Sequence, residues 1–454
     1  MTSLAVVPSK PTGVAPWIAG GILATAVLIA AFALALDATK LTLFQVLAAG
    51  IGLLIVLGIA LWRYKWAVSL AFLLLGFQII DPAPVDLVLV IVIAVAFVTG
   101  KLALSSVPTW VVVTMGAFIA MGMLSTTEAI KVGRAAFFLS ITVYLCAFGL
   151  WVCAYVTTQE RARTILTCLI VVSVISAIGG SLTLFMDVPV FNTIADGQRA
   201  EALFDDPNIY GPFLVAVSLL LLQELIEPRL LKRWGRPLLA LLTAIVTIGW
   251  FLSYSRAAWL NYGVALAVFL VLLPLRRGGA TRALVLVLVV IAGAGTTVAT
   301  VVLTGQSTFV QERAQKQSYD TDRFGAQRLG IEVAETRPLG IGPGQFEVVS
   351  PVSAHSTYIR AGAEQGFVGF LLVLVLFVGT LLVAINNVLW GKDTAGIGSL
   401  GLLAIWCGTL ANSVFIDTLH WRHLFVFAGL IWSGSLAAPA ISQASSRAGV
   451  RNPM

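Results

Sequence analysis

Charged residues are scarce in this sequence. They make up 11% of its 454 residues, whereas hydrophobic residues make up 59% and the mean hydropathy is +0.97. Average soluble domains carry roughly 25% charged residues. The composition therefore excludes a soluble globular enzyme, a disordered regulator and a nucleic-acid-binding domain. The net charge of +7 indicates orientation in a membrane rather than a nucleic-acid partner.

Cysteine and histidine are also scarce, with four and three residues in the whole chain. Every cysteine lies in an apolar run, and none has a histidine or an acidic residue nearby at zinc-ligand spacing. We therefore expect neither a metal site nor a disulfide framework. The pattern predicts small, buried hydrophobic residues at Cys146, Cys153, Cys168 and Cys407.

Long apolar runs dominate instead. A bilayer core about 30 Å thick requires roughly 17–25 apolar residues in a helix. Fourteen runs approach that length: Trp17–Leu36, Leu41–Trp62, Trp66–Ile80, Pro84–Thr99, Val107–Leu124, Ala135–Val156, Thr164–Met186, Ile209–Ile226, Pro237–Tyr254, Ala257–Pro274, Ala283–Thr304, Phe367–Trp390, Ile397–Phe415 and Leu424–Ala438.

The third and fourth runs are short and could form one broken unit, so we predict about 12–14 transmembrane helices. Residues 1–16 show no signal-peptide cleavage pattern, and we expect the first run to remain as a span. The fold class that follows is an all-α, polytopic integral membrane protein, with residues 1–454 forming a single membrane domain.

Basic residues are divided unequally between the links. With the N-terminus in the cytoplasm, the cytoplasmic links and the two chain ends hold 16 Lys and Arg residues. The short links on the opposite face hold 6. This asymmetry follows the positive-inside rule. We predict that both termini are cytoplasmic, which requires an even number of spans.

Two longer polar segments, residues 187–208 and 305–366, fall on the outer face in this topology, and the second is expected to contain short helices. Polar residues gathered above an apolar body are where binding and catalysis are expected.

In the first segment Asp206 and Asn208 flank a proline at the start of a span, so they either cap the helix alone or also serve the site. Arg199 is a candidate diphosphate ligand, because its guanidinium fork matches phosphate oxygens.

Other outer-face motifs contain arginine and glycine. Arg256 lies in a tight turn between two spans. It serves either as an interfacial anchor or as a contact to a lipid diphosphate. The long segment contains Arg323, followed by a glycine-rich turn with Gly340 and Gly342. This turn is not a nucleotide P-loop, because no Lys-Ser/Thr pair follows it.

His355 is the best candidate for a general base near neutral pH, because it stands in the long outer segment between arginines. The alternative is a hydrogen-bonded loop histidine, and an interfacial structural role is expected for His420 and His423. If the chain is helical from residue 355, His355 shares a face with Tyr358, whereas Glu364 lies opposite and starts the helix or tethers the loop. Nearby cations are expected to lower the pKa of His355.

Taken in order, these motifs resemble the O-antigen ligase and O-antigen polymerase family of bacterial membrane glycosyltransferases. The resemblance covers roughly residues 190–390. Its four elements are Arg199 before Leu203-Phe204 and Pro207-Asn208; Ser255-Arg256; Arg323 before Pro338, Gly340 and Gly342; and His355-Ser356-Thr357-Tyr358 before Glu364, Gly366 and Gly369. Ser356 stands where the family usually has Asn, Gln327 stands where Trp is common, and two more spans are predicted than the twelve typical of the ligases.

The resemblance implies a multi-pass enzyme of the bacterial inner membrane with its active site on the extracytoplasmic face. Such an enzyme takes a glycan from an undecaprenyl-diphosphate-linked donor and passes it to a hydroxyl of a glycan or lipid-linked acceptor, as a ligase or a polymerase. His355 would be the catalytic base. The donor diphosphate would be bound by Arg199, Arg323 and Arg256, with Asp206, Asn208, Tyr358, Glu364, Gly340 and Gly342 in support.

Arginines can stabilise a departing diphosphate without a metal, so we expect a metal-independent reaction with no cofactor. A single displacement would invert the anomeric carbon. The expected partners are the donor, the acceptor and membrane lipids, but no nucleic acid. One alternative function is a transporter or flippase for lipid-linked sugars. Such a protein requires polar residues at mid-membrane, which the predicted spans almost lack. Another alternative is a structural scaffold for an envelope polysaccharide complex.

Overall fold

The computed structural model describes residues 43–79, 83–102, 107–186, 188, 191, 199–275, 278–303, 305, 307–315 and 320–436. Within these ranges the chain is helical and forms no strand, only two isolated bridges. The prediction of an all-α protein is confirmed. The first predicted span, Trp17–Leu36, the two chain ends and parts of the 187–208 and 305–366 segments lie outside the described residues.

The α-helices follow one another through mostly short links. They are α2 (Leu43–Trp62), α3 (Tyr64–Leu73), α4 (Pro84–Val98), α5 (Thr109–Ser125), α6 (Val132–Tyr155), α7 (Gln159–Leu182), α8 (Pro207–Ile226), α9 (Arg236–Phe251), α10 (Arg256–Leu272), α11 (Gly279–Leu303), α12 (Ser307–Ala314), α13 (Asp320–Thr336), α14 (Phe346–Val349), α15 (Thr357–Leu389), α16 (Ser399–Asn412) and α17 (Arg422–Ser435).

Six helical segments of the described chain are long and apolar enough to cross a membrane. They are Thr109–Glu128, Val132–Tyr155, Gln159–Leu182, Pro207–Ile226, Arg256–Leu275 and Thr357–Leu389. Shorter apolar helices accompany them, among them α4, α9 and α16. The polytopic membrane architecture is therefore confirmed, while the total of 12–14 spans stays a prediction.

The predicted span Phe367–Trp390 matches the second part of α15, which resumes after a kink. Helix α15 already begins at Thr357, where the side chain of Ser356 accepts the first cap hydrogen bond from the Ile359 amide. The backbone kinks at Gln365 and Gly366, whose φ of +66° lies in the left-handed region. The residues before this kink, 357–364, form a separate polar helical segment, and the apolar run begins where the helix resumes.

The core of the bundle is built from helices whose aromatic side chains stack. Trp151 on α6 stacks on Phe148 and Tyr155 of the same helix, and its ring is fully buried. α17 packs closely against α6 at small residues: a Cβ on Gly429 would lie 2.6 Å from the carbonyl oxygen of Gly149. Glycines allow two helix backbones to approach in this way. Of the four cysteines, the first three are buried and Cys407 is half-buried, and all are free thiols.

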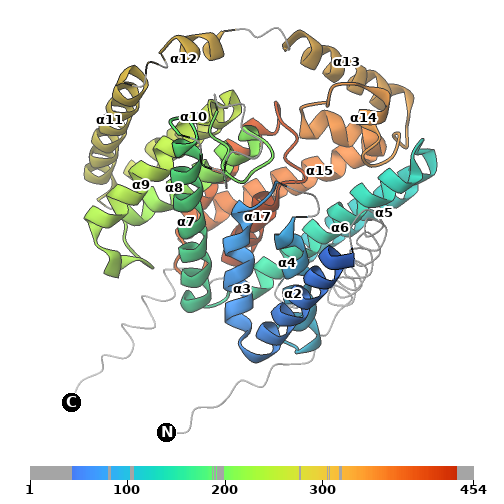
Figure 1. The fold of residues 1–454 in the computed structure, drawn as a ribbon, viewed down its shortest axis with the longest axis horizontal. Coiled ribbons are helices and arrows are strands. Elements are labelled where there is room, and N and C mark those ends of the chain that lie inside the picture. The colour runs from blue at the N-terminus through green and yellow to red at the C-terminus, as the bar shows by residue number, and fades with distance from the viewer. Residues whose placement is uncertain are drawn as a thin grey trace.

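The long segment between α11 and α15 adds three helices at one end of the bundle. In Figure 1, α12 and α13 lie along its upper edge, and α13 and α14 lie beside the start of α15 at the upper right. Hydrogen bonds tie the glycine turn between α13 and α14 to α15: the amides of Ile341 and Gly342 donate to the carbonyls of Ala363 and Glu364 at 3.0 and 2.9 Å. This end of the bundle carries the cavities described next.

Candidate active site

Residues from five distant parts of the chain line one cavity of about 580 Å³. Its polar walls come from the loop before α8, the start of α10, the start of α13 and the segment before α15. The lining includes Arg199, Asn208, Arg256, Asp320, Asp322, Arg323 and His355. The fold thus brings the three arginines expected to bind the donor into one cavity with the expected base. We refer to this space as the arginine cavity.

Arg199 is positioned by the turn between α9 and α10. Its Nε donates to the carbonyl of Ser253 at 2.9 Å, and its Nη2 lies 3.4 Å from the side-chain oxygen of Asn208. That same oxygen accepts a 2.7 Å hydrogen bond from the hydroxyl of Ser255, the N-cap of α10. Asn208 therefore connects the first outer segment to the Ser-Arg turn. Asp206 caps α8, as predicted, by accepting a hydrogen bond from the Asn208 amide at 2.7 Å.

Arg256 forms a bidentate ion pair with Asp320, the first residue of α13. The two contacts measure 3.0 and 2.5 Å, and the side chains are 30% and 10% exposed. One turn further along α13, Arg323 donates to the carbonyl of Phe415 at 2.6 Å. The Arg256–Asp320 pair thus holds the start of the helix that presents Arg323 to the cavity.

His355 stands just before α15 rather than inside it, with a left-handed φ of +45°. The conditional expectation that it shares a helical face with Tyr358 is therefore wrong, since the helix begins two residues later. Gln327 of α13 donates to its carbonyl at 3.3 Å. Few residues other than glycine adopt positive φ, so this backbone is held by its surroundings.

Burial lowers the pKa of His355 below its usual value, and the charge of Arg323 lowers it further, whereas Asp206, Asp417 and Glu347 act to raise it. The predicted direction is confirmed, but burial is the main cause and the cation is second. A neutral imidazole near pH 7 can accept a proton.

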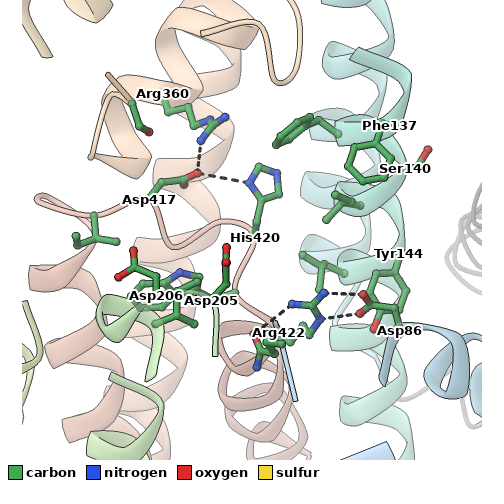
Figure 2. A pocket seen from close by; sticks show the side chains of 18 of the residues that line it. Asp86, Phe137, Ser140, Tyr144, Asp205, Asp206, Arg360, Asp417, His420 and Arg422 are labelled. Atoms are coloured by element: carbon green, nitrogen blue, oxygen red, sulfur yellow. Dashed lines mark hydrogen bonds and ion pairs between the residues drawn. The ribbon is translucent and has the colours of Figure 1, made fainter. Parts of the chain in front are cut away.

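A second cavity, of about 380 Å³, adjoins the first at His355, and the residues found in both linings are His355 and Ile416. One wall is apolar and comes from α4 and α6. The polar residues are Asp86, Asp205, Asp206, Arg360, Asp417, His420 and Arg422, with Tyr144 and Ser140 among the others (Figure 2). We refer to it as the acidic cavity.

Arg360 is the centre of a buried charge network that sequence reasoning missed. Its side chain is 9% exposed and contacts Glu347 at 2.8 Å, Asp417 at 2.9 Å and Glu364 at 3.2 Å. Figure 2 shows Asp417 between Arg360 and His420, which lies 3.4 Å from the same carboxylate. Burial acts to raise the pKa of Asp417, but the charge of Arg360 and the contact with His420 outweigh it and hold the pKa well below its usual range. The sequence did offer one signal for this network, because Arg360 is a charged residue close to a predicted span, where charged side chains are usually paired.

A second ion pair lies at the far end of the acidic cavity. Arg422, at the start of α17, contacts the carboxylate of Asp86 in the first turn of α4 at 2.6 and 2.5 Å. It also reaches the side-chain oxygen of Gln78 at 3.2 Å. Figure 2 shows the pair next to Tyr144. These contacts join α4 to α17 and close this end of the cavity.

Glu364 and the two glycines lie outside the two cavities and contact one another. The carboxylate of Glu364 accepts hydrogen bonds from the amides of Gly344 and Phe346 at 2.8 and 3.2 Å. Gly340 and Gly342 have φ of +76° and +97°, and a Cβ on Gly340 would lie 2.4 Å from the Glu364 backbone. The turn packs against α15 and lines neither cavity. Its glycines therefore allow the backbone of the turn to lie close to the backbone of α15.

The remaining expected site residue and the other histidine face the protein interior. Tyr358 donates to the carbonyl of Leu410 at 3.2 Å and packs against Phe377, and it lines neither cavity. His423 is buried between Phe213 and Trp421. Among the described residues, no group of three or more His, Cys, Asp and Glu side chains is arranged to hold a metal ion.

A family model described as O-antigen ligase matches residues 239–374. The match confirms the resemblance drawn from the motifs and includes Arg256, Arg323 and His355, whereas Arg199 and Asn208 precede it. No curated protein matches the chain. The match indicates a membrane enzyme of the ligase or glycosyltransferase type in polysaccharide or lipopolysaccharide biosynthesis, a family whose lipid-linked glycan donor and acceptor lie in the membrane.

Proposed function

We propose that this protein, which carries the O-antigen ligase match, transfers a glycan from an undecaprenyl-diphosphate-linked donor to an acceptor hydroxyl without a metal ion. The reaction takes place at the extracytoplasmic leaflet of the bacterial inner membrane. One observation carries the proposal: Arg199, Arg256, Arg323 and His355, from four separate segments, line the same cavity. Cations together with one titratable base are what a transfer from a diphosphate leaving group requires.

In this proposal the arginine cavity binds the donor diphosphate. Arg199 and Arg323 already donate to backbone carbonyls, which fixes their side chains near the cavity. Arg256 contributes from the same wall while paired with Asp320. Preorganised donors stabilise charge that develops on a leaving group, because they need not reorient during the reaction.

His355 is then the general base. The acceptor oxygen attacks the anomeric carbon of the donor sugar, and its proton passes to the imidazole. The bond between the anomeric carbon and the phosphate oxygen breaks, and the polyprenyl diphosphate leaves with the electron pair. A single in-line displacement of this kind inverts the anomeric carbon. The lowered pKa of His355 supports this role, because the base must be neutral before the attack.

The acidic cavity binds the acceptor on the opposite side of His355. Asp206 and Asp417 offer carboxylate oxygens to sugar hydroxyls, and the apolar wall from α4 and α6 faces the rest of the acceptor. Carboxylates accept hydrogen bonds and cannot donate them when ionised, which suits hydroxyl donors. Because the two cavities meet at His355, donor and acceptor would approach the base from opposite sides.

Transport of a lipid-linked sugar remains the alternative from another class. A transporter places its polar site near the bilayer midplane. The charged residues that line the two cavities lie instead in loops or in the first turns of helices, as with Asp86 in α4 and Arg422 in α17. This distribution favours catalysis at the surface.

The proposal is tested with purified protein, a polyprenyl-diphosphate glycan donor and EDTA. We expect transfer to continue in EDTA, and His355→Ala to lose about 10²- to 10⁴-fold in rate, the usual contribution of a general base, while still binding the donor. His423→Ala serves as the control, because it removes a buried histidine outside both cavities. Full activity of His355→Ala would end the assignment of the base, and complete inhibition by EDTA would end the metal-free reaction.

A further inference from the structure

A separate pair of cavities lies at the other end of the bundle. α8 begins beside the arginine cavity at Asn208 and ends at Ile226. Its 20 residues span about 30 Å at 1.5 Å per residue, which is about the thickness of the bilayer core. The two cavities next to Ile226 therefore lie near the opposite membrane surface from His355.

The first of these cavities, of about 400 Å³, is lined mostly by charged residues. Among the described residues, its lining contains Arg229, Arg236 and Arg282 and one carboxylate, Glu227. That carboxylate is already engaged by Arg229 and Arg282. Arg229 also pairs with Asp393, outside the cavity lining. The lining thus carries more positive than negative charge and suits an anion.

The second cavity, of about 510 Å³, adjoins the first and is mostly apolar. Ile226, Arg236 and Arg282 line both cavities, so the two arginines stand where the charged space meets the apolar one. Pro237, Ala240 and Val285 continue the apolar lining along α9 and α11, and all three are exposed.

We propose that these two cavities form a binding site for an anionic phospholipid, with its phosphate headgroup at Arg236 and Arg282 and an acyl chain along the groove between α9 and α11. The argument is one of charge and shape. A free anion would need only the first cavity, whereas an amphiphile needs a cationic pocket joined to an apolar groove. Basic pockets between membrane helices at a membrane surface bind acidic lipid headgroups. The site is distinct from the proposed catalytic site and does not rest on it.

The neighbouring surface supports a lipid as the occupant. Leu238 and Leu241 on α9 are 42% and 56% exposed, and Leu284 and Leu288 on α11 are 59% and 58% exposed. Large apolar side chains exposed on both flanks of the groove fit acyl chains and not water.

The test measures lipid retention by native mass spectrometry of the full-length protein, with phosphatidylglycerol and phosphatidylcholine added separately. The wild type should retain phosphatidylglycerol preferentially. Arg236→Gln combined with Arg282→Gln should weaken this retention on the order of 30-fold, because each basic side chain near an anionic lipid contributes roughly fivefold. Lys232→Gln combined with Arg233→Gln is the matched control, since it removes the same charge nearby but outside both cavities.

A second variant keeps the proposal falsifiable if loss of Arg282 disturbs the fold. Ala240→Trp fills the apolar groove and leaves every charge in place, and it should also reduce phosphatidylglycerol retention. Equal retention by the two double variants, or equal retention of phosphatidylcholine by the wild type, would overturn the headgroup site. Displacement of the lipid by glycerol phosphate as effectively as by phosphatidylglycerol would show a site for a soluble anion instead.

Discussion

The ion pair between Arg256 and Asp320 gives the sharpest test of how the arginine cavity is built. Arg256 has two roles in our reading: it holds the start of α13 through Asp320, and it lines the cavity proposed for the donor diphosphate. Asp320 also lines the cavity, but a carboxylate repels a diphosphate, so only Arg256 can serve both as tether and as phosphate ligand. Neutralising each residue separately therefore distinguishes the tether from phosphate binding.

The size of the effect follows from the contacts. Hydrogen bonds to charged groups contribute about 1.5–3 kcal/mol. We take the lower end for the tether because the Arg256 side chain is 30% exposed. About 1.4 kcal/mol corresponds to tenfold in rate, so Asp320→Asn should lose roughly tenfold in glycan transfer. Arg256→Gln loses the tether and a phosphate contact together, and we expect a loss of roughly 100-fold or more.

The assay is transfer of a polyprenyl-diphosphate glycan by purified variants, arranged as a double-mutant cycle. Asp322→Asn is the matched control, because it removes the same charge from the same helix and cavity but not the partner of Arg256. Full activity of Asp320→Asn would refute the tether. Equal losses for the two single variants, with full recovery on exchanging Arg256 and Asp320, would refute phosphate binding by Arg256.

Four further predictions address the rest of the molecule. Arg199→Ala and Arg323→Ala should abolish most transfer, and Lys at either position should restore it only partly, because Lys lacks the bidentate fork; full activity with Lys at both would contradict specific phosphate binding. Because burial and Arg323 lower the pKa of His355 below its ordinary value of about 6.5, the rate should fall to half only at a pH below about 6.5. A rate already halved at pH 7 would argue for another base. Gly340→Ala and Gly366→Ala should each destabilise the fold by more than about 2 kcal/mol in thermal unfolding, because both positions need positive φ and a Cβ would lie within 2.4 Å of backbone atoms. The control is Gly325→Ala, which has open space around it and should not lower the stability. An impermeant thiol reagent should label Glu335→Cys but not Lys232→Cys in intact cells, and the reverse pattern would invert the predicted topology.

The sequence by itself determined the class of fold and the chemistry available to it. Scarce charge and long apolar runs require backbone hydrogen bonds to be satisfied within helices, so a polytopic helical membrane protein follows directly. The ends of most spans were also predictable, because apolar runs stop where polar links begin. Arg199, Arg256, Arg323 and His355 stood out because they lie in the predicted outer-face links, in motifs that resemble one enzyme family.

Only the tertiary structure decided which of these residues meet. Arg360 pairs with Asp417, 57 residues away along the chain, and Arg422 pairs with Asp86, 336 residues away. No local pattern predicts such partners, because they depend on how α15 and α17 pack against distant helices. The same packing explains why Tyr358, expected in the site, faces Phe377 instead. The pKa of His355 is likewise a property of the fold, since its main cause is burial, which arises only when the helices assemble.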